Sequence, residues 1–97
     1  MKLNILRGKL LALLKELYPD GMEEMAIIAI EHEYYKPDDV RASLSYLTDK
    51  TYILKKQTSH PLKPGEMIVG YKIAPSGIDL IDGNIPTDPG ITLSFGA

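Results

Sequence analysis

The densest group of residues that could do chemistry in this 97-residue chain is basic. Three lysines and a histidine fall within nine positions, and Glu66 is the one acidic residue close behind them. Lysines grouped in this way can neutralise the phosphates of a nucleic acid. A solvated hairpin tip would have the same composition, so the pattern alone leaves both interpretations open. The four residues are Lys55, Lys56, His60 and Lys63.

A second polar group occupies one face of the segment at residues 38–50. Apolar residues recur there at i, i+4 and i+7 from Val40, which predicts a helix with one buried stripe. On the opposite face, Arg41 has the planar fork of donors that recognises a guanine edge. We expect this arginine and the adjacent lysines of the basic group to point outward together. The candidate DNA-contacting residues are Arg41, Ser45, Thr48 and Lys36 around this helix, and Lys55, Lys56 and Lys63 in the basic group.

The chain lacks the residue patterns that catalysis or metal binding needs. His32 and Glu33 begin an H-E-x-x-H pattern, but Lys36 occupies the position of the second histidine. Ser59 and His60 are adjacent, yet the sequence offers no evident partner to orient them for nucleophilic catalysis. The chain contains no cysteine, which excludes disulfides and thiolate metal sites. We therefore expect a protein that is not an enzyme, with no catalytic residue, metal or cofactor.

Composition predicts one small domain. With 44% hydrophobic residues, the chain is ordinary for a globular protein and too short for two cores. No segment reaches about 18 uncharged residues, and Arg7 interrupts the first apolar run, so we expect a soluble, cytoplasmic protein without a membrane partner. The net charge is −2, and the first fifty residues carry seven basic and nine acidic side chains. Binding to nucleic acid would therefore need a local basic patch.

The first helix is predicted at residues 3–18, where six leucines fall in a stripe about 100° wide on a helical projection. Pro19 should end it. Leu11 and Tyr18 lie one heptad apart and extend the apolar face beyond the stripe. They indicate either a generous core face or the seam of a dimer. Leu11 and Tyr18 are therefore the candidate dimerisation residues.

A second helix is predicted from residue 22 to about residue 34. Asp20 and Glu23 have the spacing of a capping box at its start. Because this segment is apolar nearly all round, we expect it to be the most buried helix. Pro37 can begin the third helix, at residues 38–50.

Two strands and a short helix follow. Apolar residues alternate in residues 52–57 and 66–74, which predicts strands on either side of a loop with two prolines and a glycine. The short helix near residues 76–82 should end at Gly83. After it, residues 84–97 form a tail rich in proline and glycine. Its apolar residues, which suggest that part of the tail lies against the domain or a partner, are Ile85, Ile91, Leu93 and Phe95.

The sequences VRASLSYLTDKTYI and YKIAPSGIDLI resemble the recognition helix with the first wing strand, and the second wing strand with the closing helix, of winged-helix regulators in the MarR and PadR-like group. The ending GIDLIDGNIPTDPGI also resembles small phage and prophage proteins. The resemblance implies an α+β winged helix at residues 1–83: a three-helix bundle, a two-stranded β wing and a short closing helix, followed by an extended tail at 84–97. It further implies a homodimer with the third helix in the major groove and the wing on the backbone.

The chain departs from the family pattern at three places, of which one is Ser76, at a position that is often basic. Ala74 stands where the family has a threonine that caps the closing helix. Asp38 and Asp39 begin the third helix where such regulators often carry serine, threonine or basic residues. These carboxylates favour the helix through its dipole, but they repel phosphates.

The leading hypothesis is a small DNA-binding transcription regulator of phage or prophage type that acts as a homodimer on double-stranded DNA. The alternative is a protein–protein adaptor on the same scaffold that does not bind DNA. In that case Glu24, Asp38 and Asp39 would form an anionic surface for a basic partner. A third possibility is a module whose tail completes the fold of another subunit.

Overall fold

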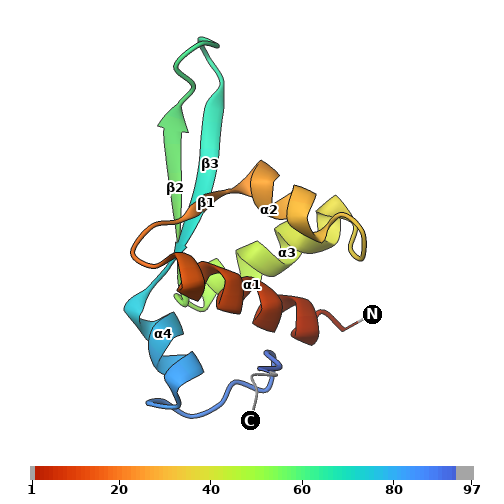
Figure 1. Cartoon of the computed structure of the whole chain (residues 1–97), viewed down its shortest axis with the longest axis vertical. Coiled ribbons are helices and arrows are strands. Elements are labelled where there is room, and N and C mark those ends of the chain that lie inside the picture. The colour runs from red at the N-terminus through yellow and green to blue at the C-terminus, as the bar shows by residue number, and fades with distance from the viewer. Residues whose placement is uncertain (1, 94–97) are drawn as a thin grey trace.

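Residues 2–93 are described by a computed structural model, and in this range the chain has four helices and one three-stranded antiparallel sheet (Figure 1). The predicted α+β winged-helix architecture is confirmed: three helices form a bundle, a β-hairpin projects from it, and a short helix closes the fold. In chain order the elements are α1 (Asn4–Leu17), β1 (Met22–Glu23), α2 (Glu24–Glu31), α3 (Pro37–Asp49), β2 (Ile53–Ser59), β3 (Met67–Ile73) and α4 (Pro75–Asp82).

Helix α1 is central to the bundle because its leucines recur on one side. Leu6, Leu10 and Leu14 have no exposed surface, and α3, α4 and β3 all pack against this helix. Burying a leucine side chain contributes about 1.5–3 kcal/mol relative to leaving it exposed. The helix ends at Leu17, ahead of Pro19, as the sequence predicted.

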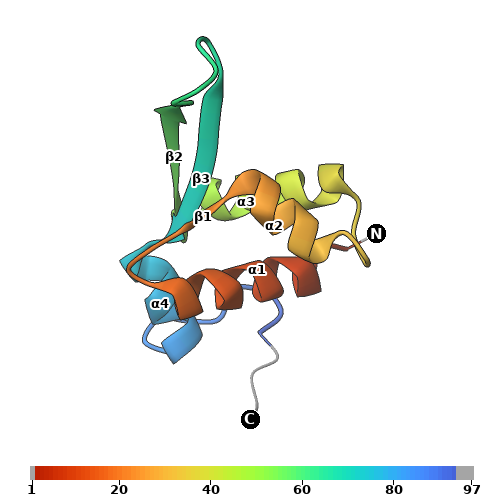
Figure 2. The ribbon, with the colours of Figure 1, turned by 45° about the horizontal axis from the view of Figure 1, so that its top comes forward.

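Strand β3 lies between β1 and β2. Strands β2 and β3 pair from Ile53 opposite Ile73 to Ser59 opposite Met67. Side chains alternate between the two faces of a sheet, so Ile53 and Ile73 enter the core while the far half of the hairpin extends beyond the helices (Figures 1 and 2). We call residues 53–73 the wing. The molecule measures 45 Å along its longest axis and 28 by 22 Å across.

The start of α2 differs from the sequence prediction. Met22 and Glu23 do not belong to the helix but pair with Tyr71 and Gly70 as strand β1, a third strand that was not predicted. Glu23 is the N-cap residue of α2, and α2 has no side-chain capping hydrogen bond there. The capping-box prediction at Asp20 and Glu23 is therefore wrong: Glu23 pairs with β3, and the backbone N–H of Asp20 donates to the carbonyl oxygen of Leu17 at the end of α1.

Helix α2 is also shorter and more exposed than predicted. It ends at Glu31 rather than near residue 34, and Met25 and Ile30 keep 65% and 52% of their surface exposed. The side carrying Ile27 and Ile28 packs into the core. The expectation that α2 is the most buried helix is wrong, because no other element of residues 2–93 covers its outer side.

The closing helix α4 begins and ends as predicted. Pro75 occupies its first turn after Ala74, whose position at the N-cap provides no side-chain hydrogen bond. At the other end Gly83 has φ of 78°, a left-handed conformation that glycine adopts without strain.

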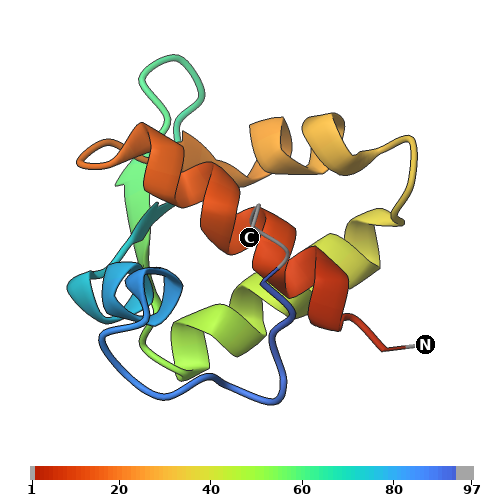
Figure 3. The same ribbon diagram turned by 60° about the horizontal axis from the view of Figure 1, so that its bottom comes forward.

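The tail lies against the domain over its described part. After α4 the chain passes beneath the bundle and returns to the first turns of α1 (Figure 3). The backbone N–H of Thr92 donates to the carbonyl oxygen of Asn4 at 3.1 Å, and Ile91 is buried in the core cluster. Gly8 makes this approach possible, because a Cβ at that position would overlap the backbone of Thr92. Phe95 lies outside the described residues. Among residues 2–93, no helix has the length and hydrophobicity of a membrane span.

Candidate nucleic-acid interface

The outer face of α3 is the surface that a winged helix presents to a groove. Pro37 begins the helix and Asp38 and Asp39 follow in its first turn, where carboxylates favour the positive end of the helix dipole. Arg41 and Ser45 are exposed on the outer face, and Lys36 is exposed just before the helix. The predicted contacts Lys36, Arg41 and Ser45 are therefore at the surface, and Lys36 is the N-cap residue of the helix.

Thr48 is less available than predicted. It is half-buried, and its hydroxyl donates to the carbonyl oxygen of Leu44, one turn earlier, at 2.8 Å. A threonine hydroxyl bonded in this way within its own helix has no donor left for a base edge.

Arg41 is held by two carboxylates. Its Nε lies 3.3 Å from Oε1 of Glu24 on α2, and its Nη1 lies 3.8 Å from Oδ1 of Asp38. The Arg41 side chain is 48% exposed, so it remains accessible, but its charge is partly compensated. The sequence revealed the acidic start of α3 but not the contact from Glu24, because that contact depends on how α2 packs beside α3.

The wing carries its lysines on both faces. Lys55 pairs with Tyr71 and so lies on the face that continues into the core, whereas Lys56 pairs with Gly70 and lies on the opposite face. The expectation that Arg41, Lys55 and Lys56 point outward together is therefore wrong for Lys56. Adjacent residues of one strand cannot share a face.

Lys56 borders an open groove of about 770 Å³ on the outer face of the sheet. Leu54 and Ile68 lie in its lining beside Lys72, and residues 19–23 form one side. The groove thus combines an apolar lining with lysines at its border.

The tip of the wing is organised by His60. Its Nδ1 accepts the backbone N–H groups of Leu62 and Lys63, at 3.0 and 3.2 Å. This histidine therefore shapes the loop instead of offering that nitrogen to a phosphate. Lys63 is exposed beside it. Across residues 2–93, no ion pair involves Lys55, Lys56 or Lys63.

The two candidate dimerisation residues differ in exposure. Leu11 has no exposed surface and packs in the core of its own chain, so it offers no surface for a dimer contact. Tyr18 is 51% exposed at the end of α1. At Leu11, therefore, the wide apolar face of α1 belongs to the core and not to a dimer seam.

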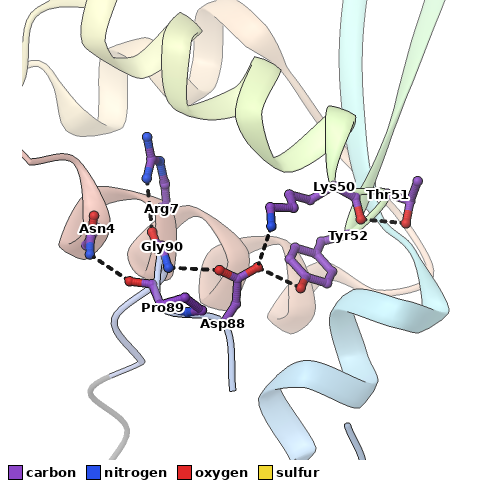
Figure 4. A network of polar contacts seen from close by, with 8 residues as sticks. All are labelled: Asn4, Arg7, Lys50, Thr51, Tyr52, Asp88, Pro89 and Gly90. Carbon is purple, nitrogen blue, oxygen red and sulfur yellow. Dashed lines mark hydrogen bonds and ion pairs between the residues drawn. The ribbon is translucent and has the colours of Figure 1, made fainter. Parts of the chain in front are cut away.

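The carboxyl end of α3 is fixed by the tail. Asp88, 8% exposed, accepts hydrogen bonds from the hydroxyl of Tyr52 and the backbone N–H of Gly90, both at 2.8 Å (Figure 4). The Nζ of Lys50, the C-cap residue of α3, lies 3.3 Å from the same carboxylate. We call Asp88 and these three partners the tail clasp. It holds the connection between α3 and the wing to the rest of the domain.

The electrostatics of the tail clasp favour an ionised Asp88. Burial alone would raise the pKa of Asp88, but the hydrogen bonds from Gly90, Tyr52 and Lys50 and the charge of Lys50 outweigh it, and the pKa lies below its ordinary value. Burial, together with the hydrogen bond to Asp88, raises the pKa of Tyr52 to about 12. The clasp therefore contains a carboxylate and a neutral phenol at neutral pH.

Two further contacts join the tail to α1. Asn4 donates to the carbonyl oxygen of Pro89 at 3.1 Å, and Nη1 of Arg7 donates to that of Gly90 at 3.0 Å. The Arg7 guanidinium also stacks 3.7 Å from the ring centre of Tyr46, on α3. Sequence reasoning predicted a packed tail from its apolar residues but missed these polar contacts.

The arrangement of helices and wing defines the fold as a winged helix, and comparison with solved structures agrees. The crystal structure of Bacillus subtilis PadR in complex with operator DNA superposes with a TM-score of 0.65 and 20% identity over 98% of this chain. It is a longer protein, of which this chain spans 54%. A PadR family transcription regulator from Clostridium difficile R20291 superposes with a TM-score of 0.58 and 16% identity, over 76% of this chain and 79% of that one.

No protein-family model and no curated protein matches the sequence. The likeness to these two proteins is thus one of fold.

Proposed function

We propose that this protein is a DNA-binding transcription regulator in which α3 enters a groove and the wing contacts the backbone. The observation that carries the proposal is the wing: Lys55, near its base on the face shared with α3, and Lys63, at its tip, are exposed and have no ion-pair partners in the described chain. Phosphate neutralisation by lysine supplies most non-specific affinity for duplex DNA. The fold shared with a PadR bound to operator DNA supports this assignment. A cytoplasmic location fits this role.

The proposal predicts that the wing lysines contribute unequally. A fluorescence-anisotropy titration with mixed-sequence duplex at about 50 mM salt should give salt-dependent binding. Lys55→Ala should lower the slope of log affinity against log salt by about one unit, because Lys55 lies on the face shared with α3. Lys56→Ala should change the slope less.

The matched control is Lys2→Ala with Lys15→Ala, which removes one positive charge from α1 and one from the segment that precedes it. These residues lie away from the wing, so the salt slope should stay at the wild-type value. Absence of duplex binding at tens of micromolar, or a control pair that weakens binding as much as Lys55→Ala, would refute the proposed interface.

We further propose that the regulator acts as a homodimer, since the few wing lysines of one chain give weak binding unless two copies act together. Tyr18, exposed at the end of α1, is the part of the predicted dimer surface that can reach a partner. Multi-angle light scattering should report twice the mass of one chain, and Tyr18→Asp should shift the distribution toward monomer. A monomer for the wild type at high micromolar concentration contradicts this proposal. The phage or prophage type stays a prediction from the ending GIDLIDGNIPTDPGI.

A second candidate function, the protein–protein adaptor, is favoured by one observation. Met25 and Ile30 are exposed apolar side chains on α2, the helix that begins with the carboxylate of Glu24. Apolar surface rimmed by charge is typical of protein interfaces. Specific capture of a host protein, lost in Met25→Ser with Ile30→Ser, together with no duplex binding by the wild type, would favour the adaptor.

A further inference from the structure

Glu24 contacts the one arginine on the outer face of α3 from a fixed position. It is the first residue of α2 and follows β1 directly, whose two residues pair with β3. Its side chain is 19% exposed, and its Oε1 lies 3.3 Å from Nε of Arg41. The carboxylate is thus anchored to the sheet, while the arginine that it contacts is 48% exposed.

Glu24 contacts Nε of Arg41, so it does not occupy the two terminal nitrogens of the guanidinium. Guanine offers O6 and N7 in the major groove, and an arginine recognises them with two parallel N–H groups. A carboxylate at Nε fixes the orientation of the guanidinium. The two terminal nitrogens of Arg41 can then donate side by side to a base. An arginine fixed in advance loses less rotamer freedom when it binds.

Asp38 acts on the same arginine differently. It approaches Nη1, one of the terminal nitrogens, at 3.8 Å, and its side chain is 97% exposed. A contact this long and exposed is weak. It uses a nitrogen that a base would need, so Asp38 competes with DNA instead of orienting the arginine.

We propose that Glu24 is a positioning residue that presents Arg41 end-on to a guanine, and that this contact gives the protein its sequence preference. The inference rests on the proposed function and extends it from DNA binding to the residue that sets specificity. The two carboxylates around Arg41 thus have opposite effects: Glu24 supports base recognition and Asp38 opposes it.

The experiment is a selection from a pool of random-sequence duplexes with the full chain. The wild type should enrich guanine about tenfold at one position, and Arg41→Ala should abolish that preference, as a bidentate contact predicts. Glu24→Ala should reduce the preference to about twofold. Its affinity for unselected duplex should not fall, because a negative charge near the phosphates is removed. Glu24→Gln, which keeps the length of the side chain and an amide oxygen that can accept from Nε, should retain more of the preference than Glu24→Ala.

Two controls separate positioning from charge and from folding. Asp39→Asn removes the same charge next to Asp38, at a residue without an ion pair among residues 2–93, and should keep the wild-type preference. Asp38→Asn should strengthen binding. Thermal unfolding shows whether Glu24→Ala is folded, and Glu24→Gln tests the positioning role if it is not.

The outcomes are distinguishable. A guanine preference that survives in Glu24→Ala, or that Asp39→Asn removes equally, overturns the positioning role while the proposed function stands. A wild type that binds no duplex overturns the proposed function and this inference together.

Discussion

Asp88→Ala will lower the free energy of unfolding by about 2–4 kcal/mol, the range expected when a buried hydrogen-bonded carboxylate is removed and its partners stay behind. Asp88 accepts from Tyr52 and Gly90 and pairs with Lys50. Without the Asp88 carboxylate, the hydroxyl of Tyr52 and the backbone N–H of Gly90 lose their acceptor where they are only partly exposed to water. Urea denaturation followed by circular dichroism measures the change.

The control for Asp88→Ala is Asp82→Ala, which removes the other aspartate paired with a lysine on a distant element. Asp82 contacts Lys15 at 2.6 Å, but both side chains are about 40% exposed. An exposed pair contributes about 0–1 kcal/mol. Equal losses in the two variants would mean that the tail clasp does not stabilise the fold.

The same carboxylate predicts a pH dependence. The pKa of Asp88 is lower in the folded than in the unfolded chain, so its ionised form stabilises the folded state. That contribution is complete above the unfolded pKa of about 4 and is lost as the pH falls through the lower folded pKa. The difference in unfolding free energy between the wild type and Asp88→Asn should therefore be constant near neutral pH and shrink below about pH 4.

Gly8→Ala will destabilise the protein by about 1–3 kcal/mol, as overpacking does, although alanine is the better helix former by about 1 kcal/mol. We expect a loss of stability instead of a gain because the new Cβ overlaps the carbonyl group of Thr92. Either the tail or α1 must move. Because the tail after α4 belongs to no helix or strand among the described residues, we expect it to move, and its amide protons, that of Thr92 first, to exchange with solvent faster.

Ala12→Gly is the matched control on the same helix. It should cost about 1 kcal/mol through helix propensity and leave the Thr92 amide protected. A stabilised Gly8→Ala with unchanged exchange at Thr92 would contradict the packing of the tail against α1.

The helices and the wing could be predicted because their signals are local. The leucine period of α1, Pro37 at the start of α3 and Gly83 after α4 each act within one or two helical turns. The start of α2 could not, because Met22 and Glu23 pair with a strand almost fifty residues away. A capping box and a strand compete for the same backbone groups, and only the packed sheet decides between them.

The candidate site could be predicted in its residues but not in its geometry. Period-two alternation of β2 already separates Lys55 from Lys56, and applying it to the wing would have avoided that error. The contact between Glu24 and Arg41 has no sequence signature, since it joins two helices whose crossing is set by the core. The partners of Asp88 are equally hidden, because Tyr52 lies 36 residues before it.

The hydrogen bond from Thr92 to Asn4 has a practical consequence for larger assemblies. Polypeptide joined before Asn4 and polypeptide joined after Leu93 would depart from neighbouring points. A fluorescent label, a tether or an additional module fused at either point would lie away from the tip of the wing (Figure 1). Such fusions would also allow a circularly permuted version, in which a short bridge joins the two neighbouring points and new ends open at the tip of the wing.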